Sequence, residues 1–188
     1  MNWTHLPNII TSIRLILLIP LSIYLIDEDY QTALAIFFIA GCSDALDGFL
    51  AKKFNWVSRF GSILDPIADK ALLVVTMAIL TMNQKFTLLF FSAVAARDIY
   101  IVLGAYIYYR RVGPFQMEPS LISKINTFMQ ILTVSALLVS LSYFELPSLM
   151  IDYLIWTVYL TVIASTIHYS WVWGNKYSSV KPVPDRLD

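Results

Sequence analysis

This chain has little cysteine and few charged residues. The first fact excludes a disulfide within the chain, and the second removes an electrostatic argument for particular partners. Cys42 is the only cysteine among 188 residues, so no disulfide can form within the chain, and its apolar neighbours predict a small packing residue. Charged residues make up only 14% of the sequence, and the net charge is zero. Overall electrostatics therefore gives no argument for a nucleic acid or an acidic partner.

The rest of the composition is that of a membrane protein. Hydrophobic residues make up 58% of the chain and the mean hydropathy is +0.67, well above that of soluble domains. Apolar segments near twenty residues long can each cross about 30 Å of hydrocarbon. We predict an all-α integral membrane protein with a single membrane-embedded domain over residues 1–188. Its six transmembrane helices are expected at about 8–26, 31–52, 60–82, 86–109, 120–143 and 148–173.

The basic residues between these segments indicate the orientation in the membrane. They cluster at alternate connections, whereas the remaining connections carry only Lys85. By the positive-inside rule, both termini and the basic connections lie in the cytosol. The N-terminus lacks a basic region followed by a short apolar run and a small-residue cleavage site, so no cleaved signal peptide is expected. The clustered residues are Lys52, Lys53, Arg59, Arg110, Arg111, Lys124, Lys176, Lys181 and Arg186.

Four carboxylates interrupt the apolar pattern of the second and third segments. Asp44 and Asp47 are three residues apart, which places them on one helical face. Asp65 and Asp69 are four apart and share a face of the next helix. A charged side chain at the centre of a membrane helix costs roughly 2.5–3.5 kcal/mol, so these acids need compensation. A ligand set made of carboxylate oxygens suits Mg²⁺ or Mn²⁺ rather than zinc or copper, and we expect two ions.

Such a metal site favours phosphoryl transfer. Magnesium that keeps open positions usually meets phosphate oxygens, and a pair of such ions neutralises a pyrophosphate leaving group. The acids also have structural explanations, because they could form ion pairs with Arg14, Lys52 or Lys70, or a polar seam that holds the helices together.

Together these residues form a recognisable pattern, which reads D-x-x-D-G-x-x-A-K, eight residues, then G-x-x-x-D-x-x-x-D. It resembles the signature of the CDP-alcohol phosphatidyltransferases, and the six-helix count extends the resemblance over nearly the whole chain. The resemblance implies the fold of that family and an enzyme in which a hydroxyl acceptor attacks a CDP-linked lipid and releases CMP. It assigns metal binding to Asp44, Asp47, Asp65 and Asp69, and makes Asp69 the catalytic base.

Residues beside the acids are candidates for binding the nucleotide. Two glycines and an alanine lie on the same faces as the acids, where missing bulk lets a nucleotide approach, although close helix packing explains the glycines equally well. Lys52 stands where the family usually has arginine and can still neutralise phosphate. Residues 6–14 resemble the family's first helix, whose polar residues hold nucleotide phosphates, although Asn8 has helix capping as an alternative. The candidates are Asn8, Thr11, Gly48, Ala51, Lys52 and Gly61.

The acceptor alcohol depends on the last three segments. Residues 122–130 resemble a stretch of the anionic-lipid branch, the phosphatidylglycerophosphate synthases and CMP-forming cardiolipin synthases. The Arg97-Asp98 pair either binds an anionic head group or compensates its own charge. Residues 24–49 look closer to the cardiolipin synthases, so we expect phosphatidylglycerol as the acceptor, with glycerol-3-phosphate as the alternative. The acceptor-binding candidates are Arg97, Arg110 and Lys124.

Two other classes of protein are alternatives to this enzyme. An acid-lined transporter would also place carboxylates in membrane helices, but matched half-repeats and paired broken helices are missing from the sequence. A non-catalytic scaffold of the same fold predicts loss of a motif acid, and all four are present. The resemblance further implies CDP-diacylglycerol as donor and a homodimer, and the compact chain suggests a bacterial inner membrane. His168 is expected to be structural.

Overall fold

The computed structural model describes the backbone of residues 6–54, 61–112 and 120–179, and the side chains of 12–43, 68, 70–108, 110 and 120–174. Within these ranges the chain forms six helices and no strand, which confirms the predicted all-α fold. The helices are α1 (Leu6–Ile26), α2 (Tyr30–Phe54), α3 (Gly61–Met82), α4 (Leu88–Val112), α5 (Leu121–Ser142) and α6 (Ser148–Ser179).

The helix boundaries follow the predicted segments closely, with two instructive differences. α4 begins at Leu88 rather than at residue 86, because the Thr87 hydroxyl accepts a hydrogen bond from the Phe90 N–H at 3.2 Å and so caps the helix. α6 continues to Ser179, past the apolar segment that ends at residue 173. The added turns are polar, so hydropathy marks the end of the apolar segment but not the end of the helix.

Three of the helices contain described stretches long and apolar enough to cross a membrane, Leu88–Tyr108, Leu121–Ser142 and Ser148–Gly174. The other three contain shorter apolar stretches, Ser12–Ile26, Tyr30–Ser43 and Lys70–Met82. Each of these shorter stretches stops where the continuously described side chains of its helix stop, at Ser12, Ser43 and Lys70. Six helices are therefore confirmed, whereas six full crossings stay a prediction.

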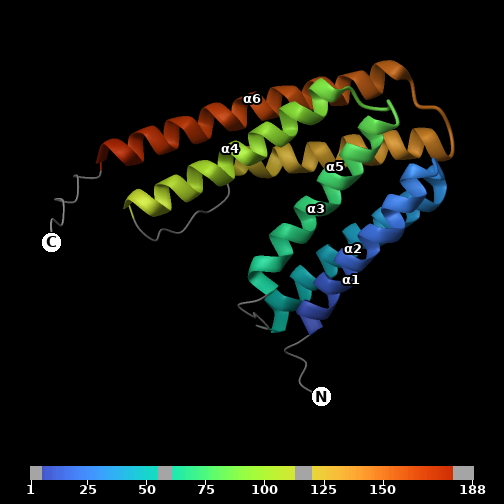
Figure 1. The fold of residues 1–188 in the computed structure, drawn as a ribbon, viewed down its shortest axis with the longest axis horizontal. Coiled ribbons are helices and arrows are strands. Elements are labelled where there is room, and N and C mark those ends of the chain that lie inside the picture. Colours follow the sequence, from blue (N-terminus) through green and yellow to red (C-terminus); the bar gives the residue numbers. More distant parts are fainter. Residues whose placement is uncertain (1–5, 55–60, 113–119, 180–188) are drawn as a thin grey trace.

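The helices pack with their short connections at one end. In Figure 1, residues 27–29, 83–87 and 143–147 gather at the right of the bundle, while the start of α1 and the end of α6 lie away from them. α1 packs against both α2 and α3, and α6 packs against α4 and α5. Successive helices therefore alternate in direction, as the alternating basic connections predict.

The outer surface of the bundle is apolar. On α6, the side chains of Trp156, Leu160, Ile163, Ile167 and Trp171 are each more than half exposed and recur every three or four residues. A soluble bundle would bury such a stripe, because its apolar face turns toward the core. Lipid is the solvent that suits this surface.

Two of the short connections use the same helix-ending turn. Glu28 after α1 and Gln84 after α3 have positive φ angles of 58° and 59°. In each case this residue and the next donate their N–H groups to carbonyls of the last helical turn, which is the Schellman arrangement. Asn83 joins the two turns, because its Nδ2 donates to the Leu25 carbonyl at 2.7 Å. This hydrogen bond holds the end of α3 against the end of α1.

Candidate functional site

The four motif acids lie on two helices that contact each other. Asp44 and Asp47 belong to the second half of α2, and Asp65 and Asp69 to the first half of α3. Helical spacing places each pair on one face. Their side chains lie outside the described residues, so their role as metal ligands stays a prediction. Among the side chains that are described, no three His, Cys, Asp or Glu residues gather into a group.

The predicted nucleotide-binding residues lie on the same helices and on α1. Their side chains also fall outside the described ranges, so their contacts stay predictions. Asn8 lies near the start of α1 as it is described, and the capping alternative for Asn8 concerns a side chain outside the described residues. Asn8 and Thr11 lie in α1, Gly48, Ala51 and Lys52 in α2, and Gly61 opens α3.

A cluster of three charges lies beside the last motif acid. Lys70 follows Asp69 on α3, and its Nζ donates to Oδ2 of Asp98 on α4 at 2.6 Å. The other oxygen of Asp98, Oδ1, accepts from Nη1 of Arg97 at 2.7 Å. Asp98 thus lies between two cations, which compensates a carboxylate that would otherwise be costly inside an apolar helix.

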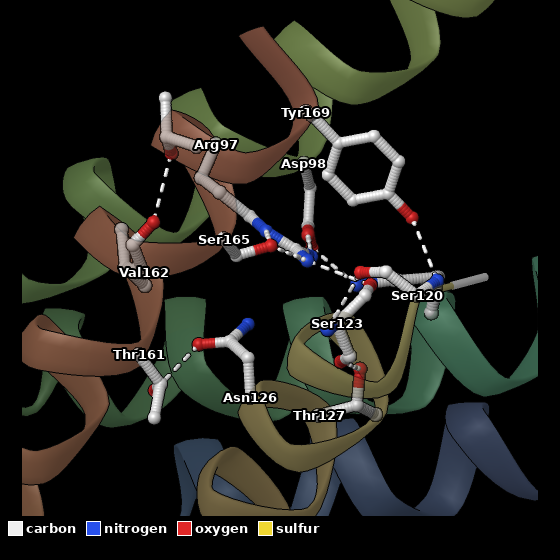
Figure 2. A network of polar contacts seen from close by, with 12 residues as sticks. Arg97, Asp98, Ser120, Ser123, Asn126, Thr127, Thr161, Val162, Ser165 and Tyr169 are labelled. Atoms are coloured by element: carbon white, nitrogen blue, oxygen red, sulfur yellow. Dashed lines mark hydrogen bonds and ion pairs between the residues drawn. The ribbon is translucent and has the colours of Figure 1, made fainter. Parts of the chain in front are cut away.

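Arg97 is held almost entirely by the protein. Figure 2 shows its guanidinium among side chains from α5 and α6, where Nη2 donates to Ser123 Oγ at 2.7 Å and to Ser165 Oγ at 2.5 Å. Nε donates to the same Ser165 hydroxyl at 3.2 Å. With Asp98, these contacts occupy most of the guanidinium's five N–H donors. The Arg97–Asp98 ion pair is therefore observed, while binding of a head group by Arg97 stays a prediction.

Polar contacts continue from this cluster between α5 and α6. The Ser120 backbone N–H donates to the Tyr169 hydroxyl at 3.3 Å, and Thr161 Oγ1 donates to Asn126 Oδ1 at 2.9 Å (Figure 2). Asn126 is fully buried. A polar seam thus joins α4, α5 and α6, and it fixes the depth of Arg97 and Asp98 in the bundle.

Two open grooves meet at Lys70. The α2/α3/α5 groove encloses about 360 Å³ and the α3/α4 groove about 500 Å³, and Lys70 lines both. The α2/α3/α5 groove is lined by Phe37, Phe38, Gly41, Cys42, Lys70, Leu72, Leu73, Thr127, Ile131 and Ser135. The α3/α4 groove is lined by Lys70, Val74, Arg97, Asp98, Ile99, Ile101, Val102, Leu103, Ser123 and Tyr169.

The α2/α3/α5 groove points toward the motif acids by helical spacing. Gly41 precedes Asp44 by three residues, so the two share a face of α2. Leu72 and Leu73 follow Asp69 by three and four residues and share a face of α3 with it. One helical turn spans about 5.4 Å, so the walls of this groove continue to the acids within a turn.

The remaining acceptor candidates, Arg110 and Lys124, are exposed. Lys124 lines a third cavity with Thr127, Phe128 and Ser123, the serine that also accepts from Arg97. Sequence reasoning missed the pairing of Lys70 with Asp98, although both are charged residues in apolar segments and so carry the signal that identified the four aspartates. Cys42 was expected to pack, and this is wrong: the residue is exposed and lines the α2/α3/α5 groove.

A family model decides which proteins this chain belongs with. The model described as CDP-alcohol phosphatidyltransferase matches residues 4–167, which include the four acids, Lys70 and the Arg97-Asp98 pair. This chain belongs to the CDP-alcohol phosphatidyltransferase family. The predicted resemblance is confirmed. The residue pattern on α2 and α3 that carried it is called the phosphatidyltransferase motif below.

Relatives within the phosphatidyltransferase family are named for two different activities. The chain is 30% identical to the rat (Rattus norvegicus) protein named cardiolipin synthase (CMP-forming), over 89% of this chain and 60% of the relative. It is 32% identical to the human (Homo sapiens) protein of that name, over 71% of this chain and 50% of the relative. It is 33% identical to the CDP-diacylglycerol–glycerol-3-phosphate 3-phosphatidyltransferase of Bacillus subtilis (strain 168), over 73% of this chain and 72% of the relative. The chain thus spans 50 to 60% of the length of the two cardiolipin synthases.

The donor set of the phosphatidyltransferase motif fits the divalent metal on which the family generally depends. Four carboxylates on α2 and α3 offer only oxygen ligands, and hard cations such as Mg²⁺ and Mn²⁺ prefer these. The two helices contact each other, so ligands from both can reach one site. The residues that would hold the metal are therefore Asp44, Asp47, Asp65 and Asp69.

Proposed function

We propose that this protein transfers a phosphatidyl group from CDP-diacylglycerol to the glycerol hydroxyl of phosphatidylglycerol, releasing CMP and forming cardiolipin. The observation that carries the proposal is the complete set of four motif acids on α2 and α3, in a chain that belongs to the CDP-alcohol phosphatidyltransferases. Members of this family use CDP-diacylglycerol and an alcohol acceptor in a membrane.

The proposed chemistry distributes its roles over the motif residues. Asp69 accepts the proton of the acceptor hydroxyl, the freed oxygen forms a bond to the lipid-bound phosphorus, and the bond between that phosphorus and CMP breaks. Two Mg²⁺ or Mn²⁺ ions, when bound, neutralise the pyrophosphate. Lys52, Asn8 and Thr11 hold the phosphates of the nucleotide, and the small residues Gly48, Ala51 and Gly61 leave room for it. The acyl chains of the donor fit the α2/α3/α5 groove, which leads along helix faces to the acids.

Phosphatidylglycerol is favoured as the acceptor by the cardiolipin synthase relatives and by the presence of a second apolar groove. A reaction between two lipids needs room for two sets of acyl chains beside one set of acids. The α3/α4 groove meets the α2/α3/α5 groove at Lys70, next to Asp69. Arg97, Arg110 and Lys124 are the other basic residues proposed to attract an anionic acceptor.

Glycerol-3-phosphate is the second candidate acceptor, favoured by the Bacillus subtilis relative, which is named for it. A water-soluble acceptor would enter from the aqueous side and would leave the α3/α4 groove without an acyl chain. We place the protein in a bacterial inner membrane as a homodimer, with both termini and the active site facing the cytosol, on the strength of its basic connections and family.

The test is a measurement of CMP release by the detergent-purified protein, supplied with CDP-diacylglycerol and Mg²⁺. Phosphatidylglycerol and glycerol-3-phosphate are offered in parallel, with Asp69→Asn as the control. Release that requires phosphatidylglycerol and Asp69 supports the proposal. Release with glycerol-3-phosphate alone makes the protein a phosphatidylglycerophosphate synthase, and no release with either acceptor overturns the transferase altogether.

A further inference from the structure

Lys70 lies where a substrate phosphate would meet both grooves. It lines the α2/α3/α5 groove and the α3/α4 groove, and it follows the proposed base Asp69 on α3. A charged side chain inside an apolar helix is expensive and generally serves a function. We infer that Lys70 binds the phosphate of an anionic glycerophospholipid acceptor, and that Asp98 positions Lys70 for this contact. The inference rests on the proposed function, whose acceptor it explains.

Among the described side chains, Lys70 is the cation beside Asp98 with more donors left for a ligand. Its side chain is 40% exposed, against 3% for Arg97. An ammonium group has three N–H donors, and among the described side chains one of them meets Asp98. Arg97, by contrast, is surrounded by Asp98, Ser123 and Ser165. A ligand in the α3/α4 groove therefore meets the ammonium of Lys70 before it meets the guanidinium.

The charge of the cluster matches a phosphodiester. Lys70 and Arg97 are cationic and Asp98 is anionic, which leaves one net positive charge at the inner end of the α3/α4 groove. A phosphodiester such as phosphatidylglycerol carries one negative charge and neutralises it. A phosphomonoester carries about −1.5 to −2 at neutral pH and leaves an excess of negative charge beside the motif acids.

The lining of the α3/α4 groove suits the rest of the same molecule. Away from Lys70 the groove is walled by aliphatic side chains of α3 and α4, among them Val74, Val102 and Leu103. Val102 and Leu103 are more than half exposed, so the groove opens toward the surrounding lipid. Its volume of about 500 Å³ lies within the roughly 300–1,000 Å³ of ordinary ligand sites. An acyl chain can therefore lie in this groove while its phosphate reaches Lys70.

Asp98 fixes the direction of the Lys70 side chain. A lysine side chain has several freely rotating bonds, and binding a ligand costs the entropy of ordering them. The 2.6 Å contact with Asp98 Oδ2 orders this side chain beforehand, and Arg97 holds Asp98 in turn. Asp98 is thus a positioning residue, which acts on the acceptor through Lys70.

The experiment compares Michaelis constants for the two lipids in the detergent-purified full-length chain with Mg²⁺. Lys70→Gln should raise KM for phosphatidylglycerol about tenfold or more, because losing a hydrogen bond to a charged group typically weakens binding by about that factor. The same substitution should leave KM for CDP-diacylglycerol within about twofold. Lys70→Arg should restore most of the loss, and Asp98→Asn should shift the same constant by less. Lys85→Gln, at the other end of α3, should change neither constant. Equal rises for both lipids, or a fall in kcat alone, would overturn the assignment.

A binding measurement separates failure of this inference from failure of the proposed function. If wild-type protein releases no CMP with phosphatidylglycerol, the proposed acceptor is wrong, and retention of lipids is then compared by native mass spectrometry. Wild-type protein should retain phosphatidylglycerol over phosphatidylcholine, and Lys70→Gln should lose this preference while Lys70→Arg keeps it. An unchanged preference in Lys70→Gln overturns the role of Lys70 whatever the protein catalyses.

Discussion

Asp98 on α4 accepts a hydrogen bond from Lys70 on α3 at 2.6 Å, so the helix that carries the last two motif acids is tied to its neighbour by a charge pair. The same carboxylate holds the buried Arg97 at 2.7 Å. One side chain therefore links a helix of the motif to the seam between α4, α5 and α6. Changes at Asp98 should affect both stability and acceptor binding.

Asp98→Ala should destabilise the protein by about 3–5 kcal/mol, because it leaves the guanidinium of Arg97 buried without its counter-charge. The measurement is thermal unfolding in detergent, followed by circular dichroism. Asp152→Ala on the exposed surface of α6 is the matched control and should change stability little. Equal losses in the two variants would mean that the pair with Arg97 contributes nothing.

Gly104→Ala should cost about 1–3 kcal/mol, because a Cβ there would lie 1.9 Å from Cη2 and Cζ3 of Trp173 on α6. The close approach of α4 to α6 at this point depends on the missing side chain. Gly41→Ala provides the comparison, since its Cβ would meet nothing within 4 Å and should be neutral or stabilising. Trp173→Leu combined with Gly104→Ala should recover part of the loss in thermal unfolding, and an absence of recovery would contradict the contact.

Gln84→Gly should raise stability by about 0.5–1 kcal/mol, because Gln84 holds a φ of 59° that costs an L-residue and is free for glycine. Gln84→Ala keeps the unfavourable backbone conformation and should bring no gain. Thermal unfolding of the two variants side by side measures the difference. A gain in the alanine variant as large as in the glycine variant would show that the backbone angle is not the cause.

The sequence predicts the helices well because each one needs only a local pattern of apolar residues. The end of α6 is missed because the polar residues 175–179 continue the helix without being apolar. Cys42 is misjudged for a related reason: apolar neighbours predict burial in a soluble core, whereas in lipid the apolar surface faces outward. Hydropathy alone therefore cannot distinguish the core of this bundle from its lipid-facing side.

The residues of the candidate site likewise fall into those that the sequence identifies and those that only the structure brings together. The four aspartates could be found because they are charged residues in apolar segments and each pair shares one face of a helix. Lys70 and Asp98 lie 28 positions apart on different helices, and no local pattern joins them. Their partnership depends on how α3 packs against α4, which is a tertiary property. The proposed acceptor side of the site is consequently the part that required the structure.

Gly41→Leu should raise KM for CDP-diacylglycerol severalfold, because the new side chain enters the α2/α3/α5 groove proposed for the donor. The first carbon of the new side chain has room, since a Cβ at Gly41 meets nothing within 4 Å, and thermal unfolding of the variant checks that the fold is kept. Gly174→Leu, at an equally open glycine of α6, is the control and should leave this constant unchanged. If KM for phosphatidylglycerol rises instead, the two grooves have been assigned to the wrong lipids.

Divalent metal should stabilise the protein as well as activate it. If the four carboxylates of α2 and α3 meet at one site they repel one another, and an ion that binds only the folded state adds about 2.7 kcal/mol at a concentration one hundred times its Kd. Thermal unfolding in EDTA and in excess Mg²⁺ or Mn²⁺ should therefore differ by several degrees, and CMP release should require the metal.

The matched variants for this measurement are Asp44→Asn and Asp152→Asn. Asp44→Asn removes one proposed ligand and relieves some of the repulsion, so it should be more stable than wild type in EDTA and gain less from metal. Asp152→Asn lies on the exposed surface of α6 and should behave as wild type in both conditions. If Asp44→Asn gains as much from metal as wild type does, the ion binds elsewhere and Asp44 is not a ligand. Because the readout is unfolding, it tests the metal site whichever lipid proves to be the acceptor.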